Sequence, residues 1–491
     1  MDKNKYDVIV IGSGIGGLTV ACLLSFSKRV LVLERKSGFG GYCATFKRKD
    51  FVFESSIHAV NNCKKGHFAY SILKNCGIIN SIKFLKNKNL YRSIFPKHDF
   101  VVQQENIKGY INRLIKYFPE ESAGIKELFN NMYSIFMEVE KINKLKILMK
   151  SPQLLNASKM SLKEMLDSYL DNEELKAIVS QYWMYCGLPP SRLSPIHFAY
   201  IAQDYMVNGG YCVKGGMKSI VDSLVDKIEK NGGKVYGNRD VEKILVENSR
   251  AIGTETRDGR AFYGDYVISN IDARYTFESL TEKNYKIEKC IEQMDKTQPS
   301  ISALKVYLGL DIDVKDLGIL DGEIFINSSY DLDKSYEAVL KNSAGIAPFG
   351  ICVHSNIDPT LCPKNKTVLS ITMLSGYDYW SKMGKEEYGR EKKRIANILI
   401  ERTAKVIPEL KDHIAMVVAA TPLTMERYTG NSKGAAYGWS RNVFFYGSKH
   451  MNIQTPIKNL FLTSNWTKIG GGVEGVLRSA DRTYNLIKNA P

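Results

Sequence analysis

The stretch YDVIVIGSGIGGLTVACLLSFSKRVLVLER, residues 6–35, decides the fold of this chain. Residues 7–11 are an apolar run typical of a buried strand, and a glycine-rich turn, a helix and a second apolar strand follow. A strand, a glycine turn and a helix in this order are typical of a Rossmann-like dinucleotide-binding unit. The stretch therefore predicts an α/β fold with a nucleotide site at the turn.

The glycines of the turn and the acid at the end of the second strand both match such a site. Gly12 and Gly14 allow a tight turn and close approach to a diphosphate, and Gly17 allows the helix to pack on the strand. The helix N-terminus offers free N–H groups and a positive dipole end to the phosphates. Glu34 follows Gly12 by 22 residues, the spacing of an acid that bonds a ribose hydroxyl, which favours FAD or NAD over NADP.

Length and charge limit the classes of protein that fit. A chain of 491 residues predicts about three structural units, and a hydrophobic content of 44% permits a large core. Lys and Arg (68) exceed Asp and Glu (52), but the basic residues are scattered and form no recognised nucleic-acid module, so we expect no nucleic-acid partner. The charge indicates an anionic membrane or a lysine-rich composition. Residues 141–150, KINKLKILMK, are typical either of a helix lying on a membrane or of a solvated amphipathic helix.

The cysteines and the apolar N-terminal run indicate the compartment. The nine cysteines form no CxxC pair and have no ligand spacing to the seven histidines, so we expect neither a disulfide framework nor a metal site. Residues 8–27 carry no charge, but their glycines divide the run into strand, turn and helix, which argues against a signal or membrane segment. We expect a reduced, cytoplasmic protein without transmembrane spans, whose candidate contact is the inner face of the membrane. Its oligomeric state stays open.

The nucleotide-binding elements recur along the chain. A second helix is predicted over residues 217–230, strands over 240–247, 251–257 and 265–270, and a further strand, glycine turn and helix near the C-terminus. Residues 80–208 are predicted to form long amphipathic helices. We therefore expect a discontinuous cofactor domain and a substrate domain of mixed sheet with a helical insert. The predicted cofactor domain comprises residues 1–75, 210–285 and 452–491, and the predicted substrate domain comprises residues 76–209 and 286–451.

Four blocks of sequence carry a resemblance to a known family that runs essentially from end to end. In these blocks the chain resembles the carotenoid desaturase, prolycopene isomerase and retinol saturase group of the FAD-dependent amine oxidase superfamily. The blocks are GSGIGGL (12–18) with Glu34 and Arg35, FESSIHAV (53–60), YCGLPPSRLSPIHFAYI (185–201) with GGYCVKGGMKSIVDSL (209–224), and TPLTMERYTGNSKGAAYGW (421–439) with NWTKIGGGVEGVLRSADR (465–482).

The resemblance implies a Rossmann-like FAD-binding domain and a set of cofactor contacts. It places the glycine turn on the diphosphate, Glu34 on the adenosine ribose and the backbone of Val241 on the adenine. It places the N-terminus of the last helix against the flavin pyrimidine, where N–H groups stabilise negative charge on the reduced ring. Asn465 stands where many relatives have an acid, and Ser55 and Ser56 replace a usual small-glycine pair. The implied FAD contacts are Gly12, Gly14, Ile15, Gly16, Gly17, Glu34, Arg35, Gly40, Gly41, Tyr42, Ser55, Ser56, Ile57, His58, Val241, Asn270, Asn465, Gly471, Gly472, Val473 and Glu474.

Two residues are candidates for catalysis. The resemblance places His58 beside the flavin, where it would either transfer the proton that accompanies hydride transfer or bond the cofactor or a backbone carbonyl. The resemblance also brings Tyr437, in the segment GAAYG, toward the flavin as a proton donor or as a wall of the substrate channel. Tyr182, Trp183 and Tyr185 either shape an apolar tunnel or belong to the core.

Three functions are compatible with these features. The first is an FAD-dependent oxidoreductase that acts on C=C bonds of a polyene or isoprenoid lipid, by desaturation, saturation or cis–trans isomerisation. Here shape and desolvation would set specificity, and the His-containing block and the GAAYG loop favour saturation or isomerisation. The second is a flavin amine oxidase that cleaves C–N bonds, against which the helical insert argues. The third is a flavin-bearing lipid carrier without turnover.

Overall fold

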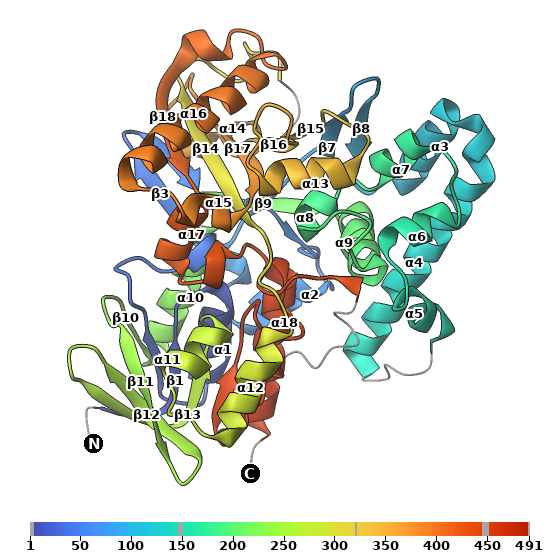
Figure 1. The fold of residues 1–491 in the computed structure, drawn as a ribbon. Coiled ribbons are helices and arrows are strands. Elements are labelled where there is room, and N and C mark those ends of the chain that lie inside the picture. Colours follow the sequence, from blue (N-terminus) through green and yellow to red (C-terminus); the bar gives the residue numbers. More distant parts are fainter. Residues whose placement is uncertain (1–3, 146–150, 320–321, 444–450, 490–491) are drawn as a thin grey trace.

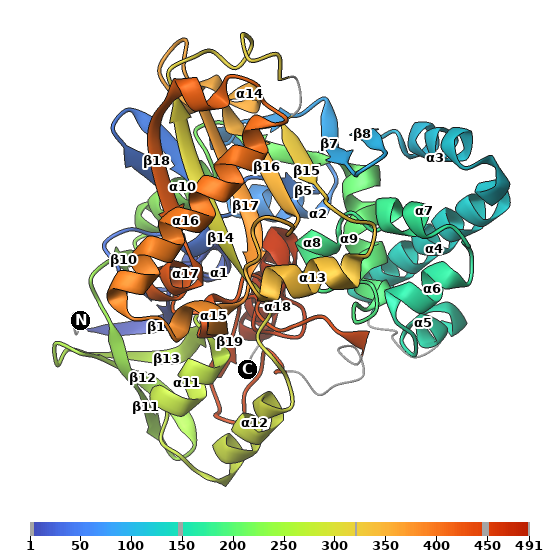
Figure 2. The ribbon, with the colours of Figure 1, turned by 45° about the horizontal axis from the view of Figure 1, so that its top comes forward.

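Two large β-sheets with helices packed around them form the framework of the molecule (Figures 1 and 2). The computed structural model describes residues 4–145, 151–319, 322–443 and 451–489. Both ends of the chain lie in the part of the molecule that holds the first sheet (Figure 1). The arrangement confirms the predicted α/β fold class.

The first sheet, which we call the nucleotide sheet, has the strand order β10-β2-β1-β13-β12-β11, with β19 paired to β13. Its β10, β2, β1, β13 and β19 are parallel, whereas β12 is antiparallel to both of its neighbours. Alternate residues of β1 enter opposite cores, with Val8 and Val10 on one face and Ile9 and Ile11 on the other. The strands are β1 Lys5–Ile11, β2 Val30–Leu33, β10 Lys234–Tyr236, β11 Val241–Glu247, β12 Arg250–Thr256, β13 Ala261–Ser269 and β19 Leu460–Leu462.

Helices cover both faces of the nucleotide sheet. Helices α1, α10 and α18 share a core with Val8 and Val10, and helices α11 and α12 share the core on the opposite face. Because α1 and α18 each follow a parallel strand and pack together, their N-termini lie at the same edge of the sheet. The helices are α1 Ile15–Ser25, α10 Lys218–Lys230, α11 Ala273–Ser279, α12 Tyr285–Asp295 and α18 Gly472–Lys488.

The second sheet has the strand order β18-β14-β17-β16-β15-β7-β8. Its neighbouring strands are antiparallel except β15 and β7, which are parallel. Strand β14 is buried along its whole length, which places it at the centre of the core. The elements are β7 Asn89–Ile94, β8 Asp99–Gln103, β14 Ser302–Leu310, β15 Glu323–Ile326, β16 Phe349–Val353, β17 Thr367–Ser375, β18 Ile414–Ala420, α13 Leu332–Leu340, α14 His354–Ile357, α15 Tyr377–Ser381, α16 Lys385–Ala404 and α17 Pro422–Thr429.

A lobe of helices stands at one side of the second sheet (Figure 1), and two small sheets join the larger units. Strand β3 pairs with β4, and β9 pairs with both β5 and β6. The elements are β3 Thr45–Arg48, β4 Phe51–Glu54, β5 Val60–Asn61, α2 Phe68–Asn75, β6 Phe84–Lys86, α3 Ile107–Tyr117, α4 Ser122–Leu145, α5 Pro152–Ala157, α6 Leu162–Asp167, α7 Glu173–Val179, α8 Trp183–Cys186, α9 Pro195–Asn208 and β9 Gly210–Val213.

One expectation about this lobe is wrong. Residues 80–208 were expected to be helical, but 84–103 hold three strands, and the first long helix is α3. Strand β7 pairs with β15, more than two hundred residues away, and this partner supplies hydrogen bonds that the local sequence does not reveal. Residues 146–150, which belong to the predicted basic segment 141–150, lie outside the described residues.

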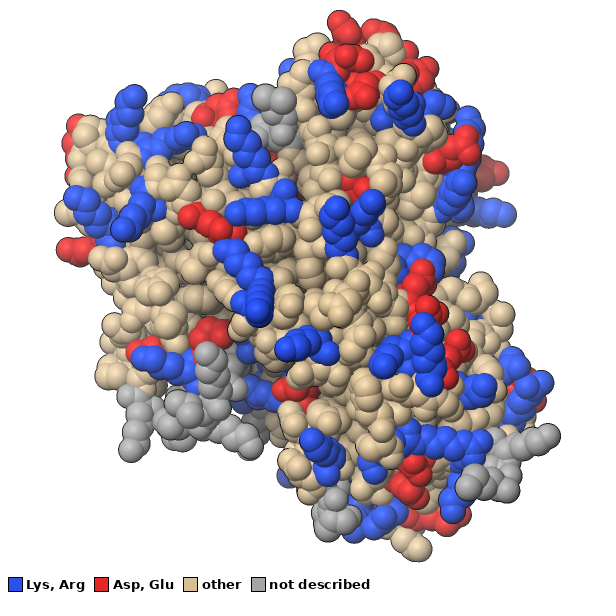
Figure 3. All heavy atoms as spheres, turned by 180° about the vertical axis from the view of Figure 1, so that it is seen from behind, with Lys and Arg blue, Asp and Glu red and all other residues tan. Residues whose placement is uncertain are grey.

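Basic and acidic side chains are interspersed over the face of the molecule seen in Figure 3. Within the described ranges no helix is long and apolar enough to cross a membrane. The nine cysteines are free thiols, and the described part of the chain contains no group of three His, Cys, Asp or Glu placed to hold a metal ion.

Candidate active site

The glycine-rich turn after β1 leaves no room for side chains. Gly12 has a φ of +91°, which disfavours any other residue. A Cβ on Gly17 would lie 2.4 Å from the carbonyl oxygen of Gly12, and a Cβ on Gly14 would lie 2.7 Å from Nδ2 of Asn270. Asn270 follows β13 and donates a 3.4 Å hydrogen bond to the Gly12 carbonyl. Asn270 therefore stabilises the turn, and the turn exposes backbone groups that are suited to bind a diphosphate.

Glu34 faces the same turn. Its Oε2 accepts hydrogen bonds from the N–H of Ser13 (2.9 Å) and from its hydroxyl (2.7 Å), and its Oε1 accepts from the N–H of Lys36 (2.9 Å). The N–H of Arg239 donates to the carbonyl of Glu34 (2.7 Å), which brings the start of β11, with Val241, to this end of the sheet. The predicted contacts of the adenosine half thus lie together.

The loop that contains Gly40, Gly41 and Tyr42 closes on the glycine turn. The N–H of Gly40 donates to the carbonyl of Ser13 (3.1 Å), and Gly40 forms an isolated β-bridge with Gly14. The Tyr42 hydroxyl donates to carbonyl oxygens of the segment before Tyr437, and burial raises the pKa of Tyr42 to about 12. The loop is therefore held between the two parts of the molecule.

Helix α18 brings a second helix N-terminus to the glycine turn. Its N-cap, Gly471, has a φ of +135° and offers no side-chain cap, and Gly472 has a φ of +62°. A Cβ on Gly16 would lie 2.7 Å from Cγ1 of Val476, so the first turns of α1 and α18 touch. Helix α1 likewise starts at a glycine without a side-chain cap. Two adjacent uncapped N-termini fit FAD, an extended molecule with a diphosphate and a ring that gains negative charge.

The segment before α18 is packed by backbone contacts. A Cβ on Gly438 would lie 2.1 Å from the carbonyl oxygen of Asn465. The guanidinium of Arg441 is buried beside Gly471, with Nη2 3.1 Å from the position of a Cβ there. Of the remaining predicted contacts, Val473 is buried in the core, and the side chain of Glu474 enters a polar cluster with Asn61, Tyr200 and Arg478.

His58 lies in a narrow pocket whose lining includes three tyrosines and three amides, namely Tyr182, Tyr185, Tyr205, Asn87, Asn89 and Gln104. The Tyr185 hydroxyl donates to both carboxylate oxygens of Glu323, at 2.5 and 2.6 Å. Nε2 of His58 lies 3.5 Å from Oε1 of Glu323, and it is buried without a hydrogen-bond partner. Burial, with the nearby Glu323 carboxylate, raises the pKa of Tyr185 well above its ordinary value. The pocket thus contains an imidazole, a carboxylate and a phenol within reach of one another.

Two further buried titratable groups stand behind this pocket. The rings of His354 and His58 meet edge to face with centroids 5.8 Å apart, and Nε2 of His354 shares a 2.9 Å hydrogen bond with Oγ of Ser370. Burial lowers the pKa of His354 well below its ordinary value, so this ring is neutral. Nζ of Lys305 donates to the carbonyl of Ser56 (3.0 Å), and burial lowers the pKa of Lys305 to about 8.

The segment from Ser55 to His58 is held by its backbone. The Tyr307 hydroxyl donates to the Ser55 carbonyl, and the N–H of Ile57 donates to the Tyr42 carbonyl (3.3 Å). With Lys305 on Ser56, these bonds fix the segment to β14 and to the loop beside the glycine turn. The predicted contacts of the flavin ring therefore lie between the nucleotide site and the pocket.

The three aromatic residues predicted to shape a tunnel or to belong to the core do not all have the same surroundings. Tyr182 and Tyr185 line the pocket, whereas Trp183 is fully buried and packs edge to face on Tyr336. The Tyr437 hydroxyl donates to the carbonyl of Met184 (2.9 Å), and burial raises its pKa. The Tyr437 hydroxyl is therefore bonded to the backbone of α8.

Comparison with known proteins assigns the chain to a family. A family model described as "Flavin containing amine oxidoreductase" matches residues 15–484. The chain belongs to this family. It is an FAD-dependent oxidoreductase, and its resemblance to the desaturase, isomerase and saturase group is confirmed.

The chain is similar to curated proteins that are named for reactions of retinol and of prolycopene. All-trans-retinol 13,14-reductase from Danio rerio is 27% identical, over 98% of this chain and 86% of the relative, and the Homo sapiens protein is 26% identical, over 94% and 82%. Prolycopene isomerase 2 from an Oncidium hybrid cultivar is 25% identical, over 89% and 76%.

Solved structures share the fold at lower identity. An oxidoreductase from Methanosarcina mazei has a TM-score of 0.66 at 19% identity, over 98% of this chain and 100% of that one. A putrescine oxidase bound to putrescine has a TM-score of 0.67 at 14% identity, over 99% of each chain. At these identities the likeness shows the fold alone.

Sequence reasoning missed Glu323, which lines the pocket of this flavoenzyme, and Lys305, which bonds the Ser56 carbonyl behind the pocket. Lys305 had a signal, because it is a single charge in the apolar strand SALKVYLGL. A charge inside a buried strand is rare without a purpose. Glu323 had no comparable signal, since it opens a short strand next to a turn.

Proposed function

We propose that this flavoenzyme saturates a C=C bond of an apolar polyene or isoprenoid lipid. FAD, when bound and reduced by an external electron donor, would supply the hydride, and saturation also needs one proton, which the protein would donate. The observation that carries the proposal is the unpartnered Nε2 of His58 in an aromatic pocket, with Glu323 at 3.5 Å. Two relatives are named for reactions of polyenes, a retinol reductase and a prolycopene isomerase, which supports this substrate class.

The pocket residues have separate roles in the proposed reaction. His58 holds the proton at Nε2 on the pocket side, and the Glu323 carboxylate stabilises the charged imidazole. Tyr185 fixes the carboxylate through its hydroxyl. Tyr182 and Tyr205 exclude water and give the polyene an apolar surface. We propose that Tyr437 is part of the channel wall.

We also propose the division of the chain and the course of the cofactor. The pairing of β19 with β13 supports a cofactor domain made of residues 1–75, 210–285 and 452–491, with the other residues in the substrate domain. The adenosine half would lie at Glu34 and Val241, the diphosphate at the glycine turn, and the flavin between the N-terminus of α18 and the segment 55–58.

Product mass tests the proposed reaction. The flavin-loaded protein is incubated anaerobically with a panel of polyenes, in oxidised and in dithionite-reduced form. A gain of two hydrogens in the reduced form supports saturation. Loss of two hydrogens, or an unchanged mass with altered retention, would replace saturation by desaturation or isomerisation. Ammonia from a parallel amine panel would establish the amine oxidase alternative.

We infer that the enzyme reaches its lipid at an anionic membrane surface, through an apolar patch on α4 and α5. The patch consists of Tyr133, Met137 and Leu155, whose side chains are 45%, 37% and 58% exposed. A hydrogen bond from Ser134 to Gln153 holds the two helices together. The exposed Lys141 and Lys159 follow Met137 and Leu155 of the patch by four residues each and would face lipid phosphates.

Vesicle sedimentation tests this surface. Tyr133→Ser with Leu155→Ser should weaken binding to vesicles that contain phosphatidylserine at least tenfold, because full burial of one such side chain contributes about 1.5–3 kcal/mol and a tenfold change in affinity is about 1.4 kcal/mol. Ile346→Ser removes an equally exposed apolar side chain elsewhere and should leave binding unchanged. Equal binding of both variants, or binding that does not fall with added salt, would contradict the proposal.

A further inference from the structure

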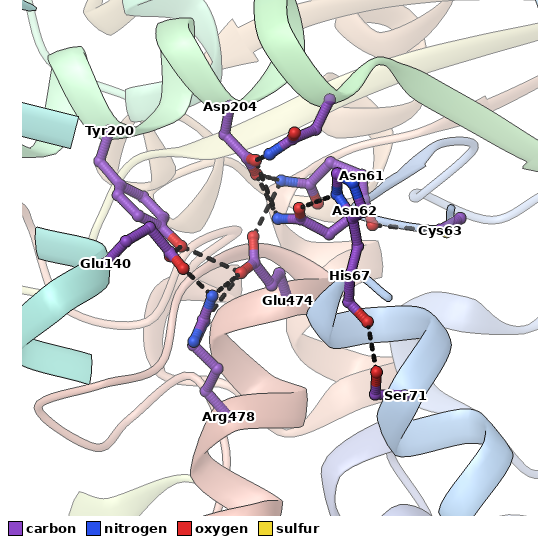
Figure 4. Close-up of polar contacts among 11 residues, drawn as sticks. Asn61, Asn62, Cys63, His67, Ser71, Glu140, Tyr200, Asp204, Glu474 and Arg478 are labelled. Atoms are coloured by element: carbon purple, nitrogen blue, oxygen red, sulfur yellow. Dashed lines mark hydrogen bonds and ion pairs between the residues drawn. The ribbon is translucent and has the colours of Figure 1, made fainter. Parts of the chain in front are cut away.

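A buried polar cluster joins the first turn of α18 to the helical lobe (Figure 4). Oε1 of Glu474 accepts hydrogen bonds from Arg478 (2.8 Å) and from the Tyr200 hydroxyl (3.0 Å), and Oε2 accepts from Nδ2 of Asn61 (3.0 Å). Arg478 also donates to Oε1 of Glu140 on α4 (2.7 Å). The cluster thus ties α4, α9, β5 and α18 together around one carboxylate.

Asp204 on α9 lies on the other side of Asn61. Its two oxygens accept hydrogen bonds from the amides of Asn61, Asn62 and Asn208. Its side chain is fully buried, and Glu474 is only 4% exposed. Two carboxyl groups therefore share the Asn61 amide in a site that excludes water.

The two carboxyls differ in charge. Burial and the neighbouring Glu474 raise the pKa of Asp204 well above its ordinary value, which favours the neutral acid, and the hydrogen bond between the two side chains gives its O–H an acceptor in Glu474. Burial opposes ionisation of Glu474 too, but Arg478 and the hydrogen bonds outweigh it and hold the pKa of Glu474 below its ordinary value. Glu474 therefore carries the negative charge and Asp204 the proton. With Glu140 and Arg478 counted, the cluster has one net negative charge.

Glu474 is the third residue of α18 after the N-cap Gly471. The N-terminus of this helix touches that of α1 at the glycine turn. A negative charge in the first turn offsets the positive end of the helix dipole. The charge on Glu474 therefore reduces the ability of this N-terminus to stabilise a second negative charge beyond it.

We propose that Glu474 lowers the reduction potential of the bound flavin, and that its ion pair with Arg478 sets the size of this effect. Glu474 is thus a positioning residue that acts on the ring through the field of α18. The proposal rests on the placement of the flavin against α18 proposed above. A carboxylate that served only to join the domains would affect stability and leave the potential unchanged.

The reduction potential of the reconstituted holoenzyme tests the proposal. The flavin is reduced anaerobically in the presence of a reference dye, and the potential is read from the two spectra without any substrate. Glu474→Gln removes the charge and should favour the reduced flavin at least tenfold, which is about 30 mV upward for a two-electron couple. Asp204→Asn is the matched control, because it replaces one neutral hydrogen-bonding group by another and should leave the potential unchanged.

Two variants that carry Arg478→Gln show whether a change in the reduction potential comes from the altered charge or from damage to the fold. Arg478→Gln leaves Glu474 in place without its counter-charge and should lower the potential. The double variant Glu474→Gln with Arg478→Gln keeps the net charge of the wild type and should return the potential toward the wild-type value. The proposal is overturned if the potential does not rise in Glu474→Gln. If that variant does not retain FAD, the proposal is overturned when the potential does not fall in Arg478→Gln. Because no substrate is present, the result is independent of the saturation reaction.

Discussion

The pocket around His58 and the cluster around Asp204 are both buried and both contain a carboxylate, but they differ in how completely their polar atoms are bonded. Nε2 of His58 has no hydrogen-bond partner and faces a pocket. Both oxygens of Asp204 accept hydrogen bonds from amides. A polar atom that lacks a hydrogen-bond partner and lies beside a cavity is free to exchange a proton with a ligand. A group whose polar atoms are all hydrogen-bonded keeps its charge state. The comparison predicts opposite responses to mutation.

The largest effect is expected at the open site. His58→Gln keeps a polar side chain but removes the proton donor, so the rate of product formation should fall about 10²–10⁴-fold. The flavin absorbance of the variant should match the wild type. His413→Gln is the control, because that ring bonds Asp311 at the surface. A rate within threefold of the wild type would exclude His58 as the proton donor.

The next effect concerns the bonded cluster. Arg478→Ala leaves the carboxylates of Glu474 and Glu140 without their counter-charge, and loss of one partner of a buried pair costs about 3–5 kcal/mol. Urea unfolding measures the loss. The exposed pair of Arg394 and Glu391 is the comparison, and Arg394→Ala should cost less than about 1 kcal/mol. Equal losses would show that the cluster is not desolvated.

The proton on Asp204 should appear as a pH dependence of stability. Because the pKa of Asp204 is raised in the folded state, the folded protein binds a proton that the unfolded chain has released. This contribution is complete below the unfolded pKa, about 3.9, and is lost as the pH rises toward the folded pKa, at about 1.4 kcal/mol per pH unit. The free energy of unfolding of Asp204→Asn, measured over the same pH range, should lack this slope. Parallel curves would mean that Asp204 is ionised.

The smallest effect is expected for the buried hydroxyl of Tyr437, which is already bonded to the backbone. Tyr437→Phe loses only the hydrogen bond to the Met184 carbonyl, so we expect a stability loss of about 1 kcal/mol and a rate within about threefold of the wild type. Tyr185→Phe loses a hydrogen bond to the Glu323 carboxylate, worth about 1.5–3 kcal/mol, and should slow the reaction about tenfold. The reverse order would make Tyr437 the proton donor.

The nucleotide site could be predicted from sequence because it is largely local. The turn, the helix and Glu34 lie within 30 consecutive residues. Glycine is required at Gly12 by its positive φ and at Gly17 by the nearby Gly12 carbonyl, and both requirements arise within this segment. The predicted helix over residues 217–230 appears as α10, which begins one residue later. Hydrophobic periodicity and helix caps are properties of a short segment, so they can be recognised in the sequence without knowledge of the fold.

The strands β6 to β8 and the His58 pocket could not be predicted in this way. Strand β7 gains its partner β15 from a distant part of the chain, and Glu323 on β15 then meets His58 in the pocket. Lys305 reaches Ser56 across 249 residues, and Asn61 reaches Glu474 across 413. A local sequence pattern does not predict which distant strands will pair. It also does not predict which loops will lie against the ends of those strands.

By itself the sequence determined the α/β class, the glycine turn with its acid, and the return of the nucleotide-binding elements at the C-terminus, because each depends on backbone conformation within one segment. Only the tertiary structure decided that Glu323 and Tyr185 line the pocket of His58, and that Glu474 and Asp204 share the amide of Asn61. The physical reason is that burial and the partners of a charged group set its charge state, and both come from residues that are far apart in the chain.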